Sequence, residues 1–195
     1  MPGASGDSGF WRPVAERLPE EWRKVRLAWP GLGVQPPDPA IQSFDGLTDL
    51  AARELGEPCD LVAQSMGGIV AMRLALRHPH NVRRIVLTAT SGGLDVASLG
   101  GADWRSDYLR AHPNAPGWVT AERPDHTAVL NKVFQPTLLL WGDADPISPV
   151  RVGERLASVL PDATLKVIAG ADHMFARDRA ADIVKLIADF LSAEG

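Results

Sequence analysis

The sequence passes from a predicted strand into a predicted helix at Asp60-Leu61-Val62-Ala63-Gln64-Ser65-Met66-Gly67-Gly68, which the apolar run 69–76 follows. The strand portion alternates little between polar and apolar side chains, as is typical of a strand buried on both faces. Ser65 lies at the junction, with the small residues Ala63 and Gly67 two positions to either side. Such a tight turn projects the serine hydroxyl above the sheet, beside a helix N-terminus. The position suits a nucleophile, although a serine that only caps the helix fits the same pattern.

Predicted strands and helices alternate on both sides of this junction. Continuous apolar runs at 85–89 and 137–141 predict two more buried strands, and the more polar run 164–168 predicts a strand at the sheet edge. Helical periodicity or composition predicts helices near residues 10–18, 47–55, 69–76, 152–160 and 180–191. The alternation predicts the α/β class, with a mostly parallel sheet flanked by helices on both faces.

Between residues 91 and 132 the alternation stops, and glycine, proline and the indoles of Trp104 and Trp118 become prominent. An insertion of this length within a compact domain is usually functional or disordered. We therefore expect residues 1–195 to form one domain in which 91–132 is a reduced lid. Trp104 and Trp118 are candidate substrate-binding residues, and the alternative is that they only pack within the lid. Four histidines follow no strand and are expected at the surface or in the lid: His78, His80, His112 and His126.

Two further strand ends carry the residue types that a serine nucleophile needs. The strand 137–141 runs into Asp143 and Asp145, and the last strand runs into His173. Serine is a weak nucleophile at neutral pH and requires a base, which an acid in turn orients. Because the carboxyl ends of parallel strands meet at one edge, we expect His173 and one of these aspartates to lie near Ser65. On residue type alone, either aspartate meets the requirement.

Four segments resemble the signature regions of the α/β-hydrolase superfamily, in particular its small esterase-like members. They are residues 2–6, 63–68, 141–145 and 172–173. The resemblance implies Asp145 rather than Asp143 as the acid, because the family's acid is usually the second aspartate of a WGxxD pattern. It also implies an oxyanion hole formed by the backbone amides of Ala4 and Met66. Pro2 stands where the family commonly has histidine, a change that a backbone contact tolerates.

The resemblance implies a serine hydrolase that cleaves small carboxylic esters through an acyl-enzyme intermediate. Ser65 would be the nucleophile, His173 its base, and Asp145 the group that orients the base. The alternatives on the same triad are C–C bond hydrolysis, thioester hydrolysis or a lyase step. An alternative of another class is a non-catalytic α/β-hydrolase-like binding protein.

The start of the chain departs from the family pattern. The family's glycine-rich loop follows a central strand, whereas here that loop begins at residue 2. The resemblance therefore implies an N-terminally truncated α/β-hydrolase fold with a short lid. A short strand is predicted at Val25–Trp29, and the missing strand would lie between it and residues 60–63. Two strand edges would then lack partners, at a free-energy cost for each buried unpaired group. The alternatives are a truncated or misassigned start and another segment of the chain that fills the gap.

Composition narrows the classes of partner. The formal charge is -4, without the clustered lysine and arginine that bind nucleic acid or an anionic membrane surface. We therefore expect a small-molecule substrate, and neither a metal nor a cofactor. The single cysteine, Cys59, excludes an internal disulfide and favours a reducing compartment. With no signal-peptide pattern and no apolar run approaching about 18 residues, we expect a cytoplasmic protein. The sequence leaves the oligomeric state open.

Overall fold

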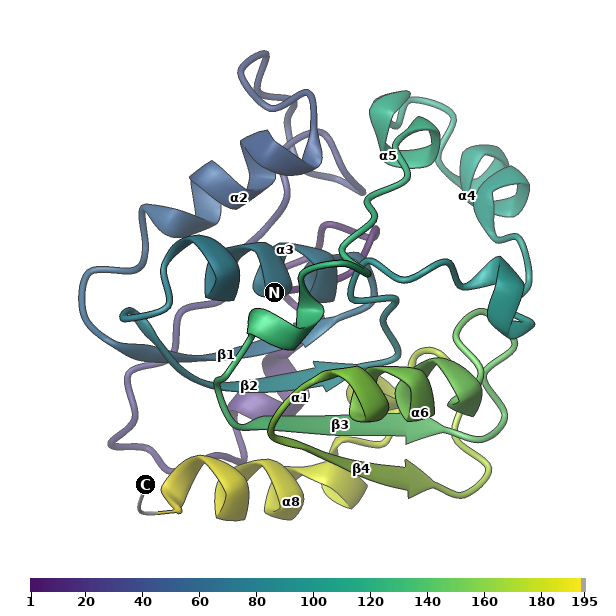
Figure 1. The fold of residues 1–195 in the computed structure, drawn as a ribbon. Helices are drawn as coiled ribbons and strands as arrows, with labels where there is room; N and C mark the ends of the chain where they lie inside the picture. The colour runs from purple at the N-terminus through teal and green to yellow at the C-terminus, as the bar shows by residue number, and fades with distance from the viewer. Residues whose placement is uncertain (194–195) are drawn as a thin grey trace.

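The computed structural model describes residues 1–193, in which strands and helices alternate around one parallel sheet (Figure 1). The strand order is β1-β2-β3-β4, with all neighbouring pairs parallel. The strands are β1 (Cys59–Gln64), β2 (Val82–Thr88), β3 (Thr137–Gly142) and β4 (Ala163–Ile168). β3 is buried along its whole length, whereas β4 is half exposed at the sheet edge. The predicted parallel sheet, with its polar edge strand, is confirmed.

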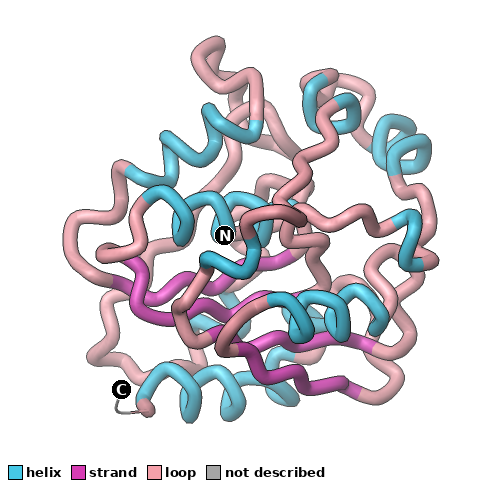
Figure 2. The backbone as a smooth tube through the Cα atoms, viewed as in Figure 1, coloured by secondary structure: helices cyan, strands magenta, loops and turns pink. Residues whose placement is uncertain are grey.

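Helices cover both faces of the sheet (Figures 1 and 2). One face carries α2 (Phe44–Ala52), α3 (Met66–Arg77) and α6 (Val150–Val159), and the other carries α1 (Arg12–Ala15), α7 (Phe175–Asp178) and α8 (Ala180–Ser192). Successive strand residues point to opposite faces, so that Val86 and Leu87 belong to different apolar clusters. Burial on both faces explains why these strands are continuous apolar runs. Among the described residues, no helix is long and apolar enough to span a membrane.

The segment 91–132 consists of short helices joined by loops. They are the 3-10 helices η1 (Ala97–Leu99) and η2 (Leu130–Lys132) and the α-helices α4 (Arg105–Ala111) and α5 (Trp118–Ala121). Of the two alternatives for His126, the surface or the lid, the structure favours the lid, because its side chain is 8% exposed. Its Nδ1 lies 3.0 Å from the Gly92 carbonyl oxygen, and Arg73 Nε donates to its Nε2 at 3.2 Å. Burial lowers the pKa of His126, which favours the neutral ring that these two hydrogen bonds require.

The predicted strand at Val25–Trp29 is wrong, because residues 23–29 have no regular secondary structure. A strand exists only where a neighbouring strand pairs with it, and a groove separates residues 23–27 from β1. Trp29 is held instead by two contacts with the glycine-rich loop. Its indole Nε1 donates to the Pro2 carbonyl at 2.8 Å, and its backbone amide donates to the Gly6 carbonyl at 3.0 Å.

Strand β1 lies at the edge of the four-stranded sheet, and Met1 pairs with its outer side. The Met1 nitrogen donates to the Val62 carbonyl at 2.7 Å, and the Met1 carbonyl accepts from the Gln64 amide at 3.1 Å. These two bonds are the register of a parallel ladder in which Met1 lies opposite Ala63. The start of the glycine-rich loop is thereby fixed beside the carboxyl end of β1.

Candidate functional site

Ser65 occupies a strained turn between β1 and α3. Its backbone angles, φ 50° and ψ -121°, lie in a region that L-residues rarely adopt. Its amide donates to the Thr88 carbonyl at 3.0 Å, and Thr90 Oγ1 donates to its carbonyl at 2.5 Å. A Cβ at Gly67 would come within 2.5 Å of the Pro2 carbonyl oxygen, so only glycine fits there. The surroundings therefore impose the conformation of Ser65, which is how strained residues persist at functional sites.

His173 lies between Ser65 and Asp145. Its Nε2 is 3.1 Å from Ser65 Oγ, and its Nδ1 is 2.7 Å from Asp145 Oδ2. The Asp145 side chain is completely buried, and its Oδ1 accepts from the amides of Ile147 and Ser148 at 2.8 and 3.0 Å. A carboxylate held at Nδ1 fixes the proton on that nitrogen and leaves Nε2 as the acceptor. The three side chains that the sequence singles out are thus brought into one hydrogen-bonded series.

The other aspartate of this loop, Asp143, makes a different contact. Its Oδ1 accepts from the Gly170 amide at 2.6 Å, and so it joins the loop after β3 to the loop after β4. The two loops pack closely, because a Cβ at Gly142 would collide with the Ala171 carbonyl. Residue type alone left two candidate acids, and the structure places Asp145, not Asp143, against His173.

Ala4 and Met66 belong to two segments that adjoin Ser65. Met66 follows Ser65 directly as the first residue of α3 and is buried. The loop that carries Ala4 passes close to Ser65, since a Cβ built on Gly3 would lie 3.0 Å from the Ser65 Cβ. A backbone amide on each side of a nucleophile is the arrangement that an oxyanion hole requires. The role of these two amides stays a prediction.

Several hydrogen bonds that fix the glycine-rich loop beside Ser65 could not be predicted from the sequence. Tyr108 donates its hydroxyl to the Ala4 carbonyl at 2.9 Å, and burial raises its pKa to about 12, so it stays a donor. Trp11 Nε1 donates to the Met1 carbonyl at 2.8 Å, as Trp29 does to Pro2. These residues lie up to about a hundred positions from their partners and match no local pattern. Only the folded chain shows that three aromatic side chains anchor the glycine-rich loop.

The candidate substrate-binding residues Trp104 and Trp118 pack on aromatic neighbours. Trp118 lies edge-on to Phe44 with ring centroids 5.5 Å apart, and Trp104 lies edge-on to Tyr108 at 5.4 Å. This packing favours the alternative that the two indoles are structural, and a substrate contact stays a prediction. Within residues 1–193, no group of three His, Cys, Asp or Glu side chains is placed to hold a metal ion.

Known proteins resemble this chain over nearly its whole length. Residues 1–131 match the family model described as the alpha/beta hydrolase family, and residues 103–194 match one described as TAP-like protein. The chain is 32% identical over 222 residues to the pimeloyl-(acyl-carrier protein) methyl ester esterase of Neisseria meningitidis, covering 90% of this chain and 85% of that protein. A 2-hydroxy-6-oxononadienedioate/2-hydroxy-6-oxononatrienedioate hydrolase of Pseudomonas sp is 26% identical over 243 residues, covering 98% and 84%. A thermophilic esterase from Thermogutta terrifontis shares the fold with a TM-score of 0.78 at 23% identity, over 97% of this chain and 87% of that one.

Proposed function

Because this chain belongs to the α/β-hydrolase family, we propose that it is a serine hydrolase that cleaves small carboxylic esters through an acyl-enzyme intermediate. The observation that carries the proposal is the hydrogen-bonded series from Ser65 Oγ through His173 to the buried Asp145 carboxylate. The related esterases of known sequence and structure support ester hydrolysis as the reaction.

In the proposed first step, Ser65 Oγ attacks the ester carbonyl carbon while His173 Nε2 takes the hydroxyl proton. The resulting imidazolium is stabilised by Asp145, which stays ionised and holds the ring in place. His173 then gives the proton to the departing alkoxide, and the acyl group remains on Ser65. In the second step, water attacks the acyl-enzyme by the same route, releasing the carboxylic acid and restoring the serine.

The proposed oxyanion hole consists of the backbone amides of Met66 and Ala4. Both would donate to the carbonyl oxygen as it gains negative charge, and removal of one such donor typically costs about 3 kcal/mol of transition-state stabilisation. The N-terminus of α3 adds a favourable dipole at the same place. The contact from Tyr108 to the Ala4 carbonyl would hold the loop that supplies the second amide.

The relative that is named a methyl ester esterase supports a small leaving alcohol. The relative named as a hydrolase of a hydroxy-oxo-dienedioate favours C–C bond hydrolysis as the second candidate function, on the same three side chains. A panel of short esters, thioesters and β-diketones separates these reactions, and we expect turnover to be fastest on the esters. A cytoplasmic location is part of the proposal, supported by the lone Cys59, which favours a reducing compartment.

The proposal is tested by Ser65→Ala. We expect hydrolysis of p-nitrophenyl acetate to fall by at least about 10³-fold, because the attacking atom is lost and only the oxyanion hole and binding remain. A fluorophosphonate probe should label the parent chain at Ser65 and fail to label the variant. Ser158→Ala, which changes an exposed serine of α6, is the matched control and should retain full activity. An unchanged rate in Ser65→Ala contradicts the proposal, and a folded parent chain that the probe does not label supports the non-catalytic binding alternative.

A further inference from the structure

His126 joins the two ends of the segment 91–132. Its backbone amide donates to the Gly93 carbonyl at 2.9 Å, and its Nδ1 lies 3.0 Å from the Gly92 carbonyl oxygen. The imidazole packs directly on this loop, because a Cβ built on Gly93 would collide with the ring. A residue near the end of the segment therefore fixes the loop at its beginning.

The two glycines of this loop need such a partner. Gly92 and Gly93 have φ angles of 58° and 98°, and glycine loses more conformational freedom on folding than any other residue. A carbonyl oxygen only accepts hydrogen bonds, so the ring proton of His126 is on Nδ1, and Nε2 accepts from Arg73 Nε at 3.2 Å. Arg73 belongs to α3, the helix that follows Ser65. The ring is thus bonded to the loop on one side and to α3 on the other.

The hydrogen bonds continue from Gly92 to the turn at Ser65. The Gly92 amide donates to Thr90 Oγ1 at 3.1 Å, and Thr90 Oγ1 donates to the Ser65 carbonyl at 2.5 Å. Thr90 is 1% exposed and packs on the first turn of α3, where a Cβ built on Gly68 would collide with it. A hydroxyl that accepts one hydrogen bond donates a second more strongly, because the two bonds polarise each other. One series of hydrogen bonds therefore leads from His126 to the residue that carries the candidate nucleophile.

We propose that His126 is a positioning residue for Ser65, which it holds through the Gly92 backbone and the Thr90 hydroxyl. The amide and the carbonyl of Gly92 flank one α-carbon, so holding the carbonyl limits the directions in which the amide can point. Without that restraint, the Thr90 hydroxyl is free to turn to another acceptor, and the strained turn at Ser65 loses one of the contacts that impose it. This role rests on the proposed function, in which Ser65 is the nucleophile.

The experiment compares two amide side chains at position 126. The amide of asparagine ends at the place of Nδ1 and can donate to the Gly92 carbonyl, whereas that of glutamine reaches the place of Nε2 and can accept from Arg73. We expect His126→Gln to lower both kcat on p-nitrophenyl acetate and the rate of fluorophosphonate labelling of Ser65 about tenfold, with KM within about twofold, because one hydrogen bond of the series is lost. His126→Asn, the conservative variant, should restore most of that loss. His80→Gln changes an exposed histidine and is the control.

A second variant tests the series from its other end. Thr90→Val keeps the shape of the side chain and removes its hydroxyl, so it should also slow labelling of Ser65 about tenfold. Because His126 is proposed to act through that hydroxyl, adding His126→Gln to Thr90→Val should slow labelling by less than about twofold more. An unchanged rate in Thr90→Val, or additive effects of the two changes, overturns the proposal.

Hydrogen exchange at the Gly92 amide is a measurement that needs no catalysis. His126→Gln should speed this exchange at least about tenfold, and His126→Asn should change it little. Equal exchange or equal labelling in the two variants overturns the proposal, because the histidine would then act by packing alone. The proposed function fails separately, if the parent chain neither hydrolyses the ester nor reacts with the probe, and exchange at Gly92 then still tests the series.

Discussion

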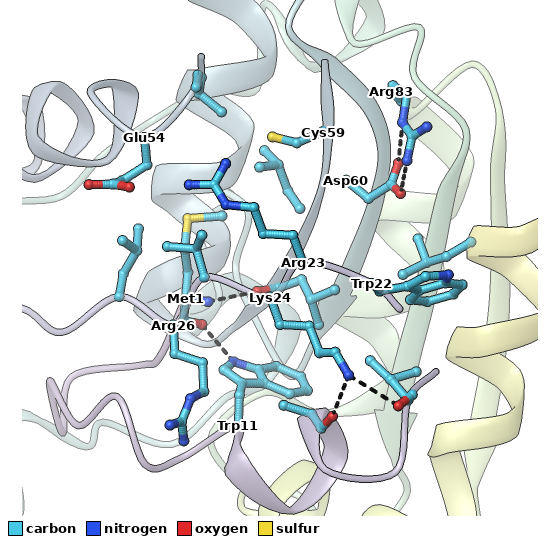
Figure 3. A pocket seen from close by; sticks show the side chains of 18 of the residues that line it. Met1, Trp11, Trp22, Arg23, Lys24, Arg26, Glu54, Cys59, Asp60 and Arg83 are labelled. Carbon is cyan, nitrogen blue, oxygen red and sulfur yellow. Dashed lines mark hydrogen bonds and ion pairs between the residues drawn. The ribbon is translucent and has the colours of Figure 1, made fainter. Parts of the chain in front are cut away.

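The carboxyl end and the outer side of β1 are held in opposite ways. At the carboxyl end, the backbone N–H and C=O of Ser65 both have partners, and the side chain continues into His173 and Asp145. Along the outer side, Met1 makes two ladder bonds and a groove takes the place of a neighbouring strand. The turn at Ser65 is therefore fixed by partners on its backbone and its side chain, whereas the outer side of β1 is fixed by Met1 at the carboxyl end of the strand (Figure 3).

The largest expected effect compares the two aspartates of one loop. Asp145→Asn should lower the rate of ester hydrolysis by about 10³- to 10⁴-fold, because the amide no longer fixes the His173 ring in the productive tautomer. Asp143→Asn should stay within a few-fold of the parent rate. The Asp143 side chain accepts a hydrogen bond from the Gly170 backbone N–H, and the side-chain oxygen of asparagine can accept the same bond. The measurement is kcat/KM on p-nitrophenyl acetate.

Thermal unfolding of both variants is the control for this pair, because each should remain folded. Similar losses of activity in the two variants would show that the loop acts as a unit, and would contradict the separate roles assigned to Asp143 and Asp145.

The next effect concerns the outer side of β1 and the dependence of stability on pH. The Met1 amine has a pKa of about 5 in the folded protein, against an ordinary value of 8.0. Between these values the unfolded chain binds more protons, so the free energy of unfolding should fall as pH drops from 8 to 5, by up to about 4 kcal/mol. Below pH 5 this group contributes no further change. Denaturant unfolding across this range is the measurement.

The matched comparison is a chain whose Met1 nitrogen is acylated, which removes the titrating group. Its profile should lack this part of the slope, while the contribution of His126, whose pKa is also lowered, stays in both chains. Identical profiles for the two chains would mean that the Met1 amine is not buried as the structure shows.

The smallest expected effect is that of removing one hydrogen bond that anchors the glycine-rich loop. Tyr108→Phe removes the hydroxyl that donates to the Ala4 carbonyl, a hydrogen bond worth about 1 kcal/mol. We expect kcat to fall about fivefold with little change in KM, because the loop would hold the Ala4 amide less well in the transition state. Steady-state kinetics on a short ester measure both values. A rise in KM with unchanged kcat would assign Tyr108 to substrate binding instead.

Strands that are buried on both faces are among the elements that sequence predicts well. The apolar runs at 85–89 and 137–141 are strands of the sheet because both faces are covered. Val25–Trp29 has the composition of a strand, but composition cannot show that the neighbouring position holds a groove. The burial of His126 could not be predicted for a related reason, since it depends on Gly92 and Arg73, which lie far away in the sequence.

For the candidate site, the sequence indicated the residues of the hydrogen-bonded series but not the residues that anchor the glycine-rich loop. Ser65 and His173 stand out at strand ends, whereas the choice of Asp145 over Asp143 came from the family resemblance and not from spacing. The structure now shows the contact that distinguishes the two carboxylates. The anchors of the glycine-rich loop, such as Tyr108 and Trp29, act across the chain and could not be predicted from local patterns.

The backbone conformation of Ser65 places its hydroxyl for reaction but lowers the stability of the fold. A residue held in such a region costs about 1–3 kcal/mol, and the net stability of a typical domain is only about 5–15 kcal/mol. The contacts from Thr88 and Thr90 must therefore offset a penalty that an ordinary turn would avoid. A change that relaxed this turn would remove the penalty but would also withdraw the hydroxyl from the imidazole.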